Sequence, residues 1–428
     1  MMNLLGHLRN FRKAGVALGL CTLAIAGTPA AQSQTYSVVF SFSGPSTGLY
    51  PVSGVTVDRA GNLYGTTQIG GPGTNCYEGC GTVFKLSRHG SGWVFTPLHS
   101  FVGGTDGGNP SARPVFAPDG SLWGTTTEGG VGCFGMGCGT VYQLQPPQHA
   151  TGNILGGWLE TVIYRFNDSG DGNMPEDADL LFDASGNVYG STFTGGDGSQ
   201  CFGGCGTVYK LTHSNGAWTE SIIHNFGNGS DGQYPWTGLI FDRSGNLYGT
   251  TSSGGPNRDG AIYQLVPSAN GWTEQVIYSF QNMDDGYISY GGLIADAAGN
   301  FYGTTCCGGP LGGGAAFQLT HSGGWVLTTL HNFQGQGPEG SLVMDAAGNL
   351  YGSTNGGGAY GKGTVFKLSP SGGDWTYTTL YDFCPSDFPC PDGAFPSGSL
   401  AIDSAGNLYG TTTDGGATGG GLVFEVTP

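Results

Sequence analysis

Seven polar and aromatic side chains stand at corresponding places in the copies of a repeated segment, where the copies differ from one another. Together these side chains could do chemistry. They are Arg113, Glu176, Asp177, Asp179, Trp236, Tyr290 and Glu339. Paired carboxylates can act as acid and base on a glycosidic bond when their separation is suitable. An aromatic ring beside carboxylates suits a sugar, or another polar ligand with an apolar face. These residue types therefore indicate either glycan binding or carbohydrate chemistry.

The tryptophan pattern and the lack of catalytic motifs favour binding. Six of the eight Trp recur at equivalent packing positions and Trp123 replaces a repeated Tyr, which leaves Trp236 without a repeat role. The sequence contains neither HExxH nor GxSxG, the signatures of zinc proteases and α/β-hydrolases. We predict a non-enzymatic binding or scaffold module for a glycan or a surface partner. The alternative is an extracellular carbohydrate-active hydrolase or lyase that uses these carboxylates.

The candidate residues stand in a chain built from seven copies of one motif, of which "DRSGNLYGTT" is an example. The copies begin at Asp58, Pro118, Asp183, Asp242, Asp296, Asp345 and Asp403. An apolar run precedes each copy, and a Gly-rich loop and a run such as "GTVYKL" follow it. In six units a Trp-led run such as "WTEQVIYSF" comes next. All these segments are strand-like in length and composition, and four short strands in about 50 to 60 residues predict a propeller blade.

The two ends of the chain predict how the ring closes. The chain stops after a third strand, while "YSVVFSF" near the N-terminus resembles a missing fourth strand. We therefore predict an all-β, seven-bladed propeller with four-stranded blades as a single domain over residues 31–428. The N-terminal strand would complete the last blade and leave no open edge. The Trp and the Phe eight residues apart in each outer run should share a face, since side chains alternate along a strand.

The repeat resembles the GloVer, or Gloeo-Verruco, tandem repeats of secreted bacterial proteins. The resemblance rests on "GNLYGTT", a following Gly-Gly and "GTVFKL", as at residues 61–67, 70–71 and 81–86. It covers nearly the whole chain after the N-terminal segment. The resemblance supports the fold and an extracellular location, and it brings no established activity.

The "DxxGN" part of the motif could be a calcium loop or a hairpin turn. A calcium site needs several converging oxygens, and each copy offers one Asp and one Asn. Asp, Gly and Asn are the residues that tight turns prefer. We interpret the segment as a turn and, because every blade needs it, as scaffold.

Acidic residues beside Gly lie in the loops that would link one blade to the next. They are Asp106, Asp171, Asp231, Asp285 and Asp392. Asp-Gly is first a turn signal, although a ring of carboxylates could bind Ca²⁺ or a cationic partner. We expect no other cofactor. His99, His224 and His331 take the position of Tyr164, Tyr278 and Tyr381 in other blades, which favours packing over catalysis.

The cysteines predict local cross-links. The close pairs are Cys76/Cys80, Cys133/Cys138 and Cys201/Cys205 before third strands, and Cys384/Cys390 in a blade-linking loop. We predict a disulfide in each pair, since no His lies near the first three and exported proteins favour disulfides over zinc. Cys306 and Cys307 could pair with each other or elsewhere.

Charge and the N-terminal segment limit the partners and the location. The net charge of −17 repels phosphate backbones, so nucleic-acid binding is not expected. Basic residues followed by an apolar run and "TPA" predict a secretory signal over residues 1–30. No later run is long enough to span a membrane. We expect an exported monomer in the periplasm, on the cell surface or outside the cell.

Overall fold

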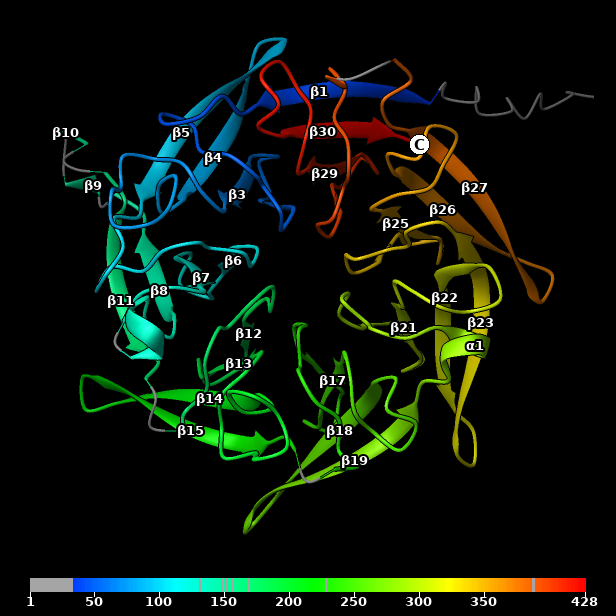
Figure 1. Cartoon of the computed structure of the whole chain (residues 1–428). Coiled ribbons are helices and arrows are strands. Elements are labelled where there is room, and N and C mark those ends of the chain that lie inside the picture. Colours follow the sequence, from blue (N-terminus) through cyan, green and yellow to red (C-terminus); the bar gives the residue numbers. More distant parts are fainter. Residues whose placement is uncertain are drawn as a thin grey trace, which may run out of the picture. The chain divides into compact units, whose positions relative to one another are not determined.

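The repeated segments fold into seven four-stranded antiparallel sheets that stand side by side in a ring (Figure 1). The computed structural model describes residues 34–428, apart from residues 131, 148, 151–152, 155–156, 168–169, 228 and 387–388. The signal expected at residues 1–30 lies outside the described residues. The sheets are the blades of the seven-bladed propeller that the repeats predict. We number the blades 1 to 7 in the chain order of their second strands.

Every blade has the same strand order from the channel outward. The first strands are β2 (Val55–Val57), β6 (Val115–Phe116), β12 (Leu181–Phe182), β16 (Ile240–Phe241), β20 (Ile294–Ala295), β24 (Val343–Met344) and β28 (Ala401–Ile402). The second strands are β3 (Leu63–Thr67), β7 (Leu122–Thr126), β13 (Val188–Thr192), β17 (Leu247–Thr251), β21 (Phe301–Thr304), β25 (Leu350–Thr354) and β29 (Leu408–Thr412). The third strands are β4 (Thr82–His89), β8 (Thr140–Gln145), β14 (Thr207–Ser214), β18 (Ala261–Ser268), β22 (Gly312–His321), β26 (Thr364–Ser371) and β30 (Leu422–Thr427). The outer strands are β5 (Gly92–Ser100), β11 (Leu159–Arg165), β15 (Ala217–Asn225), β19 (Gly271–Ser279), β23 (Trp325–Gln334), β27 (Asp374–Asp382) and β1 (Thr35–Ser41).

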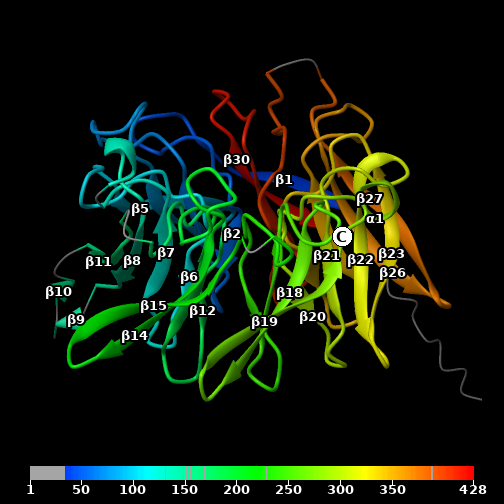
Figure 2. The same cartoon turned by 60° about the horizontal axis from the view of Figure 1, so that its bottom comes forward.

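A few short elements stand outside this pattern. Between β8 and β11 the chain forms a hairpin of β9 (His149–Ala150) and β10 (Asn153–Ile154). A 3₁₀ turn, η1 (Cys133–Gly135), follows β7, and the helix α1 (Asn282–Asp285) follows β19. In Figure 2 the hairpin that joins β18 to β19 extends below the ring, while the loops around α1 lie above it. The two faces of the ring therefore differ: one carries hairpin tips and the other carries the longer loops.

The two chain ends close the ring as predicted. The last sheet has the order β1-β30-β29-β28, with Thr35 opposite Thr427. Figure 1 shows β1 in blue beside β30 in red. Tyr36 also stacks on Tyr381 of blade 6 at 3.8 Å between ring centroids. The N-terminal strand thus completes blade 7 and packs against blade 6.

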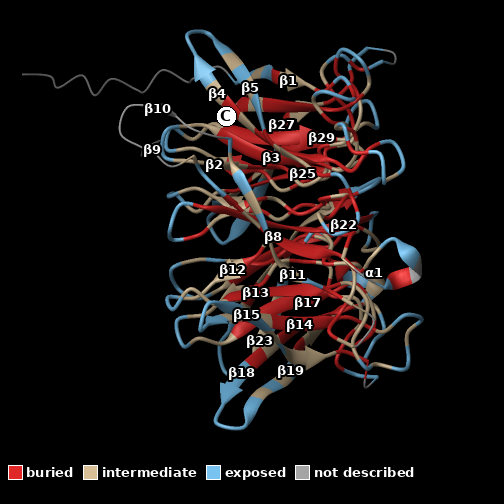
Figure 3. Cartoon of the chain, turned by 90° about the vertical axis from the view of Figure 1, so that its left-hand side faces the viewer, coloured by how far each residue is buried: buried red, intermediate tan, exposed pale blue. Residues whose placement is uncertain are grey.

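The core lies in the second and third strands, because each blade is covered by a neighbour on both faces. Every residue of a second strand such as β17 is buried, and Figure 3 shows these inner strands in red. Gly249 of β17 is needed for this packing. A Cβ atom there would come within 2.3 Å of the Tyr263 hydroxyl on β18.

One expectation about the outer strands is wrong. Trp218 of β15 packs edge-to-face on Trp123 of blade 2, at 5.2 Å, whereas Phe226 packs on Tyr263 of blade 4, at 5.0 Å. The Trp and the Phe therefore face opposite neighbours. The cause is a β-bulge at Ile223, since Ile222 pairs with Tyr209 but His224 pairs with Val208. The extra residue shifts the alternation of the side chains.

The "DxxGN" segment is the predicted hairpin turn. The Oδ1 atom of Asp242 accepts the backbone N–H groups of Ser244 and Asn246, at 2.8 and 2.9 Å. Its Oδ2 atom accepts the Asn246 amide at 2.7 Å and the Tyr248 hydroxyl at 3.1 Å. Partial burial acts to raise the pKa of Asp242, but these donors outweigh it and lower the pKa. Both carboxylate oxygens are used within the turn.

The acids of the blade-linking loops also act within their own loops. Asp171 accepts the N–H of Asn167 at 3.1 Å and the hydroxyl of Tyr164 at 2.6 Å. The same backbone bond recurs at Asp106, Asp231, Asp285 and Asp392. These residues are therefore turn formers in the structure.

The histidines at the Tyr position fall into two kinds. His99 and His224 face the loop acids Asp106 and Asp231 at 3.4 and 3.2 Å, in the way Tyr164 faces Asp171. His331 instead stacks on Tyr377 at 4.1 Å. All three are strand residues, as predicted. Packing alone explains His331, whereas His99 and His224 also contact a loop acid.

Candidate functional site

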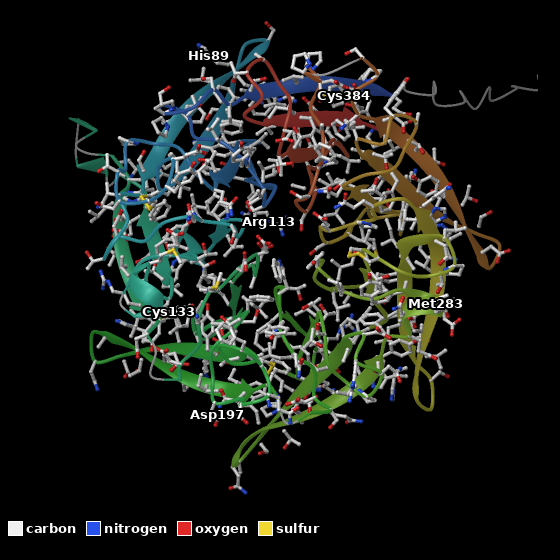
Figure 4. All side chains as sticks on the ribbon, viewed as in Figure 1. His89, Arg113, Cys133, Asp197, Met283 and Cys384 are labelled. Carbon is white, nitrogen blue, oxygen red and sulfur yellow. A yellow bond between two sulfur atoms is a disulfide. The ribbon has the colours of Figure 1, made fainter. Side chains whose placement is uncertain are left out.

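A pocket of about 580 Å³ opens at the end of the central channel where the first strands begin. All seven residues singled out in the sequence line it: Arg113, Glu176, Asp177, Asp179, Trp236, Tyr290 and Glu339. Figure 4 shows the labelled Arg113 toward the centre of the ring, with Asp197 and Met283 toward its outer edge. Residues from different blades, far apart in the chain, thus share one cavity.

The repeat places these side chains in two layers. The outer layer holds the fourth residue before each first strand, or the third before β2: Val52, Ser111, Asp177, Trp236, Tyr290, Glu339 and Ser397. The inner layer holds the second residue before the strand, and among its members are Arg113, Asp179, Gly238, Gly292, Ser341 and Ser399. Because the blade scaffold is constant, the identity of these residues alone decides the chemistry of the pocket.

The blade link that carries Trp236 is held by the preceding blade. The N–H of Tyr234 bonds the carbonyl of Cys205 at 2.8 Å, and the carbonyl of Tyr234 accepts the N–H of Ser252 at 3.1 Å. Tyr234 takes a left-handed φ of 58° to make both bonds. The disulfide Cys201–Cys205 closes the loop that presents the Cys205 carbonyl. A cross-link before one blade therefore helps to position a pocket residue of the next.

The other predicted disulfides are also present, namely Cys76–Cys80, Cys133–Cys138 and Cys384–Cys390. Two of them repeat the arrangement beside Trp236. The carbonyl of Cys80 accepts the N–H of Asn109 at 2.9 Å, and that of Cys138 accepts the N–H of Met174 at 3.0 Å. These contacts hold the links that carry Arg113 and Asp177.

Cys306 and Cys307, whose pairing the sequence left open, bond to each other. Cys306 donates its N–H to Ile288 at 3.0 Å and accepts the N–H of Gly337 at 3.1 Å. Ile288 stands two residues before Tyr290, and Gly337 stands two residues before Glu339. The buried Cys306 therefore joins two neighbouring links of the pocket wall.

Trp236 and Asp177 form the best-defined contact in the pocket. The indole N–H of Trp236 donates to the Asp177 carboxylate at 2.7 Å, and the Ser111 hydroxyl accepts the N–H of Asp177 at 3.2 Å. Tyr290 and Phe193 pack edge-to-face on the indole at 5.1 and 4.4 Å. The ring of Trp236 is thus fixed in orientation while part of its surface faces the pocket.

Arg113 and Asp179 form an ion pair in the inner layer. Both Nε and Nη2 of Arg113 donate to the same carboxylate oxygen of Asp179, at 3.0 and 2.5 Å. The two side chains are about three-quarters buried, with 21% and 27% exposed. The single cation of the pocket is therefore already engaged by one of its four acids.

The remaining acids have weaker partners. Glu339 accepts only neutral amide donors, from Gln336 at 3.2 Å and Asn355 at 3.0 Å. Glu176 has no hydrogen-bond partner among the described residues, and it is an insertion, since the other links have one residue fewer before the strand. Asp177, which follows it, takes a left-handed φ of 46°. The insertion thus places an extra carboxyl group at the mouth.

Burial raises the pKa values of these acids, and their nearness to one another adds to the rise. Burial, and then the charge of Asp177, raise the pKa of Glu176 to about 7. Asp177 remains open to solvent on its pocket side, but protein atoms surround the mouth. This loss of hydration raises the pKa of Asp177 to about 6, against the lowering effect of the Trp236 N–H. Burial also raises the pKa of Glu339.

Besides five serines, three polar pocket residues were missed by the sequence interpretation. Gln68, Asn355 and Thr413 line the pocket and directly follow the second strand of blades 1, 6 and 7. Each stands directly after the constant "YGTT" or "YGST", at a position that varies between copies. Alignment of the seven copies at this position would have found them.

A possible ligand set for a metal lies elsewhere. Among the described residues, His99, Asp106 and Glu160 bring one ligand atom each within 4.8 Å of one another, at the boundary of blades 1 and 2. The next boundary holds Tyr164, Asp171 and Glu220 in the same places. Since Tyr replaces His there without loss of the contact to Asp, we assign this group a structural role.

Comparison with protein families identifies the repeat. The chain matches the Gloeobacter/Verrucomicrobia repeat over residues 26–203, 198–391 and 335–428. It belongs to this family. No curated protein matches the chain.

Solved structures share the fold of this Gloeobacter/Verrucomicrobia repeat protein at low identity. One is the extracellular domain of BT4673 from B. thetaiotaomicron, assigned as a one component system: it is 10% identical with a TM-score of 0.53, and the match covers 91% of this chain but 39% of that one. Another, from Bacteroides uniformis, is assigned as a 6-phosphogluconolactonase, with 12% identity, a TM-score of 0.47 and coverage of 77% and 84%. At 10% identity, the likeness to the BT4673 domain shows the fold alone.

Two further observations bear on location. The five disulfides are typical of an exported protein. Within the part of the chain that the structure describes, no helix has the length and apolar character of a membrane span.

Proposed function

We propose that this protein is a secreted or cell-surface binding module, without catalytic activity, that holds a glycan in the pocket at the channel mouth. The observation that carries the proposal is the Trp236 indole, fixed by its bond to Asp177 at 2.7 Å inside this pocket. A ring held in one orientation offers a face for stacking at little cost in conformational entropy.

The rest of the pocket supports this function. Its volume, about 580 Å³, falls in the range of pockets that hold small molecules. Tyr290 extends the aromatic surface beside Trp236. Serine, Gln68 and Asn355 side chains around the mouth offer hydrogen-bond donors and acceptors, which sugar hydroxyls require. An apolar platform with a polar rim is the arrangement that recognises a saccharide.

A glycan array tests the proposal, with the protein from residue 31 onward compared with its Trp236→Ala variant. We expect wild-type protein to bind one class of glycan and the variant to lose that signal. Tyr77→Ala removes an exposed aromatic side chain that does not line the pocket, so it is the matched control and should retain binding. Absence of binding to every glycan, or equal binding by Trp236→Ala, would refute the proposal.

The second candidate is a carbohydrate-active hydrolase or lyase, favoured by the pKa of about 7 at Glu176. A carboxyl group that is partly protonated near neutral pH can act as a general acid, and an ionised neighbour can act as a base. A screen of glycosidase and lyase substrates tests this function. Activity that Glu176→Gln or Asp179→Asn abolishes would support it, whereas activity that persists in both variants would assign the reaction to other residues.

A further inference from the structure

The acids of the pocket outnumber its cations. Four carboxylates and one guanidinium line the mouth, and Arg113 is paired with Asp179. Glu176, Asp177 and Glu339 therefore have no positively charged partner among the lining residues. Burial is the main reason that their pKa values are raised, and the charges of neighbouring acids add to the rise. A cation brought by the ligand would fill this gap.

The unpaired acids and the aromatic rings lie on the same part of the wall. Asp177, Trp236, Tyr290 and Glu339 come from the consecutive blades 3 to 6. Trp236 touches both Asp177 and Tyr290. An ammonium group near these acids would also lie close to the two aromatic faces, which attract cations.

The opposite part of the wall is neutral. Blades 7 and 1 contribute Val52, Ser53, Ser397, Ser399 and Thr413. A ligand that carries charge at one end and hydroxyl groups at the other matches both parts of the wall. This polarity within one pocket argues against a uniformly neutral saccharide.

We infer that the ligand is an amino sugar whose free, protonated amine lies among Glu176, Asp177 and Glu339. The inference rests on the proposed glycan-binding function and narrows it to saccharides with an unacetylated amine. The sugar ring stacks on Trp236, and the ammonium group replaces the missing cation of the pocket. Arg113 remains bound to Asp179, so the inner layer has no unpaired carboxylate for the ammonium group of the ligand.

The test uses two matched ligands, a glucosamine tetramer and its fully N-acetylated form, titrated calorimetrically near neutral pH. They share their rings and linkages and differ in charge. We expect the free-amine tetramer to bind about tenfold more tightly, the effect of one charge-assisted hydrogen bond. Added salt should weaken that ligand and leave the N-acetylated one unchanged.

Variants separate the pocket acids from the overall negative charge. Glu176→Gln combined with Glu339→Gln should reduce the preference for the amine to less than about threefold. Asp197→Asn removes an exposed acid at the outer edge of the ring (Figure 4) and should keep the preference. If the double variant does not fold, Glu176→Gln alone tests the same point, because Glu176 has no hydrogen-bond partner among the described residues.

The outcomes distinguish the inference from the proposed function. Equal or tighter binding of the N-acetylated tetramer, with Trp236 required, overturns the amino-sugar inference and leaves glycan binding intact. Failure of all saccharides overturns both. Binding of spermine in place of both tetramers also overturns both, because the pocket would then take a polyamine without a sugar ring.

Discussion

Trp236 of blade 4 donates its indole N–H to the Asp177 carboxylate of blade 3, at 2.7 Å across the blade boundary. Neither residue belongs to the constant part of the repeat. Each stands on a link that a disulfide-bonded cysteine of the preceding blade holds through its carbonyl: Cys205 for Trp236 and Cys138 for Asp177. The repeat thus supplies a rigid frame, and the residues that differ from it build the site.

Loss of the Asp177 carboxylate should weaken ligand binding without unfolding the protein. In Asp177→Ala the indole N–H loses its acceptor, so Trp236 no longer has one fixed orientation. Removal of a charged hydrogen bond corresponds to a loss of affinity of about tenfold or more. Titration of the glycan and a thermal melt of the same variant test this. A large fall in melting temperature with unchanged affinity would contradict it.

Removal of the Cys201–Cys205 cross-link should affect the site more than the fold. The Cys205 carbonyl holds the link two residues before Trp236, so Cys201→Ser/Cys205→Ser should reduce glycan affinity severalfold. The matched control is Cys384→Ser/Cys390→Ser, whose link leads to the neutral Ser397 side of the mouth. If both double variants lose the same affinity, the positioning role of Cys205 is wrong.

Three consecutive blade boundaries contain a glutamate beside a buried tyrosine. The pairs are Glu160 with Tyr142, Glu220 with Tyr209 and Glu274 with Tyr263. At the other boundaries Phe takes the place of the tyrosine and an apolar or aromatic residue that of the glutamate. Burial, and then Asp171, raise the pKa of Glu220 to about 7. Burial also dominates at Glu274 and raises its pKa to about 7, with Asp231 adding to the shift and His224 opposing it.

These raised pKa values predict that stability falls as pH rises. The folded state binds more protons than the unfolded state between the ordinary pKa of 4.5 and about 7, so the free energy of unfolding decreases across that window. The lowered pKa of half-buried His331 acts in the opposite direction, but one His opposes several carboxyl groups. Melting temperatures across this pH range should fall for wild type and change less for Glu220→Gln/Glu274→Gln. An identical pH dependence in both proteins would rule out these glutamates as the cause.

Asp242 should matter for stability and not for binding. Its carboxylate accepts four hydrogen bonds within one turn, so Asp242→Ala should lower the free energy of unfolding by about 1–3 kcal/mol. Denaturant unfolding measures this loss, and glycan affinity of the folded variant should stay unchanged. If added Ca²⁺ stabilised the wild-type protein but not Asp242→Ala, the result would instead favour the calcium-loop interpretation.

The fold was predictable because each copy of the repeat contains the strands of one blade. Seven copies of the motif, six of them with "DxxGN", and the strand-like runs around them determine the blade count. The unmatched strand ending at Phe42 determines the closure. The face of Trp218 was predicted wrongly because a bulge at Ile223 has no clear mark in the sequence.

The site was predictable only in part. Residues that break the repeat could be found by alignment of the copies, which is why Glu339 and Trp236 were found together. Their contacts depend on the angles between blades, so the Trp236–Asp177 bond and the Arg113–Asp179 ion pair could not be derived from the sequence. The Tyr–Glu pairing was visible in the copies, since "GTVY" accompanies a Glu two residues after Trp218. The raised pKa of that Glu could not be predicted, because it depends on burial in the folded protein.

The dissociation constant of the best glycan for wild-type protein and for Trp236→Ala tests the central claim most directly. The stacked ring and its fixed indole predict a loss of about tenfold or more in Trp236→Ala, whereas Tyr77→Ala, outside the pocket, should stay within about twofold of wild type. A glycan that binds Trp236→Ala as tightly as wild type would show that the channel mouth is not the binding site.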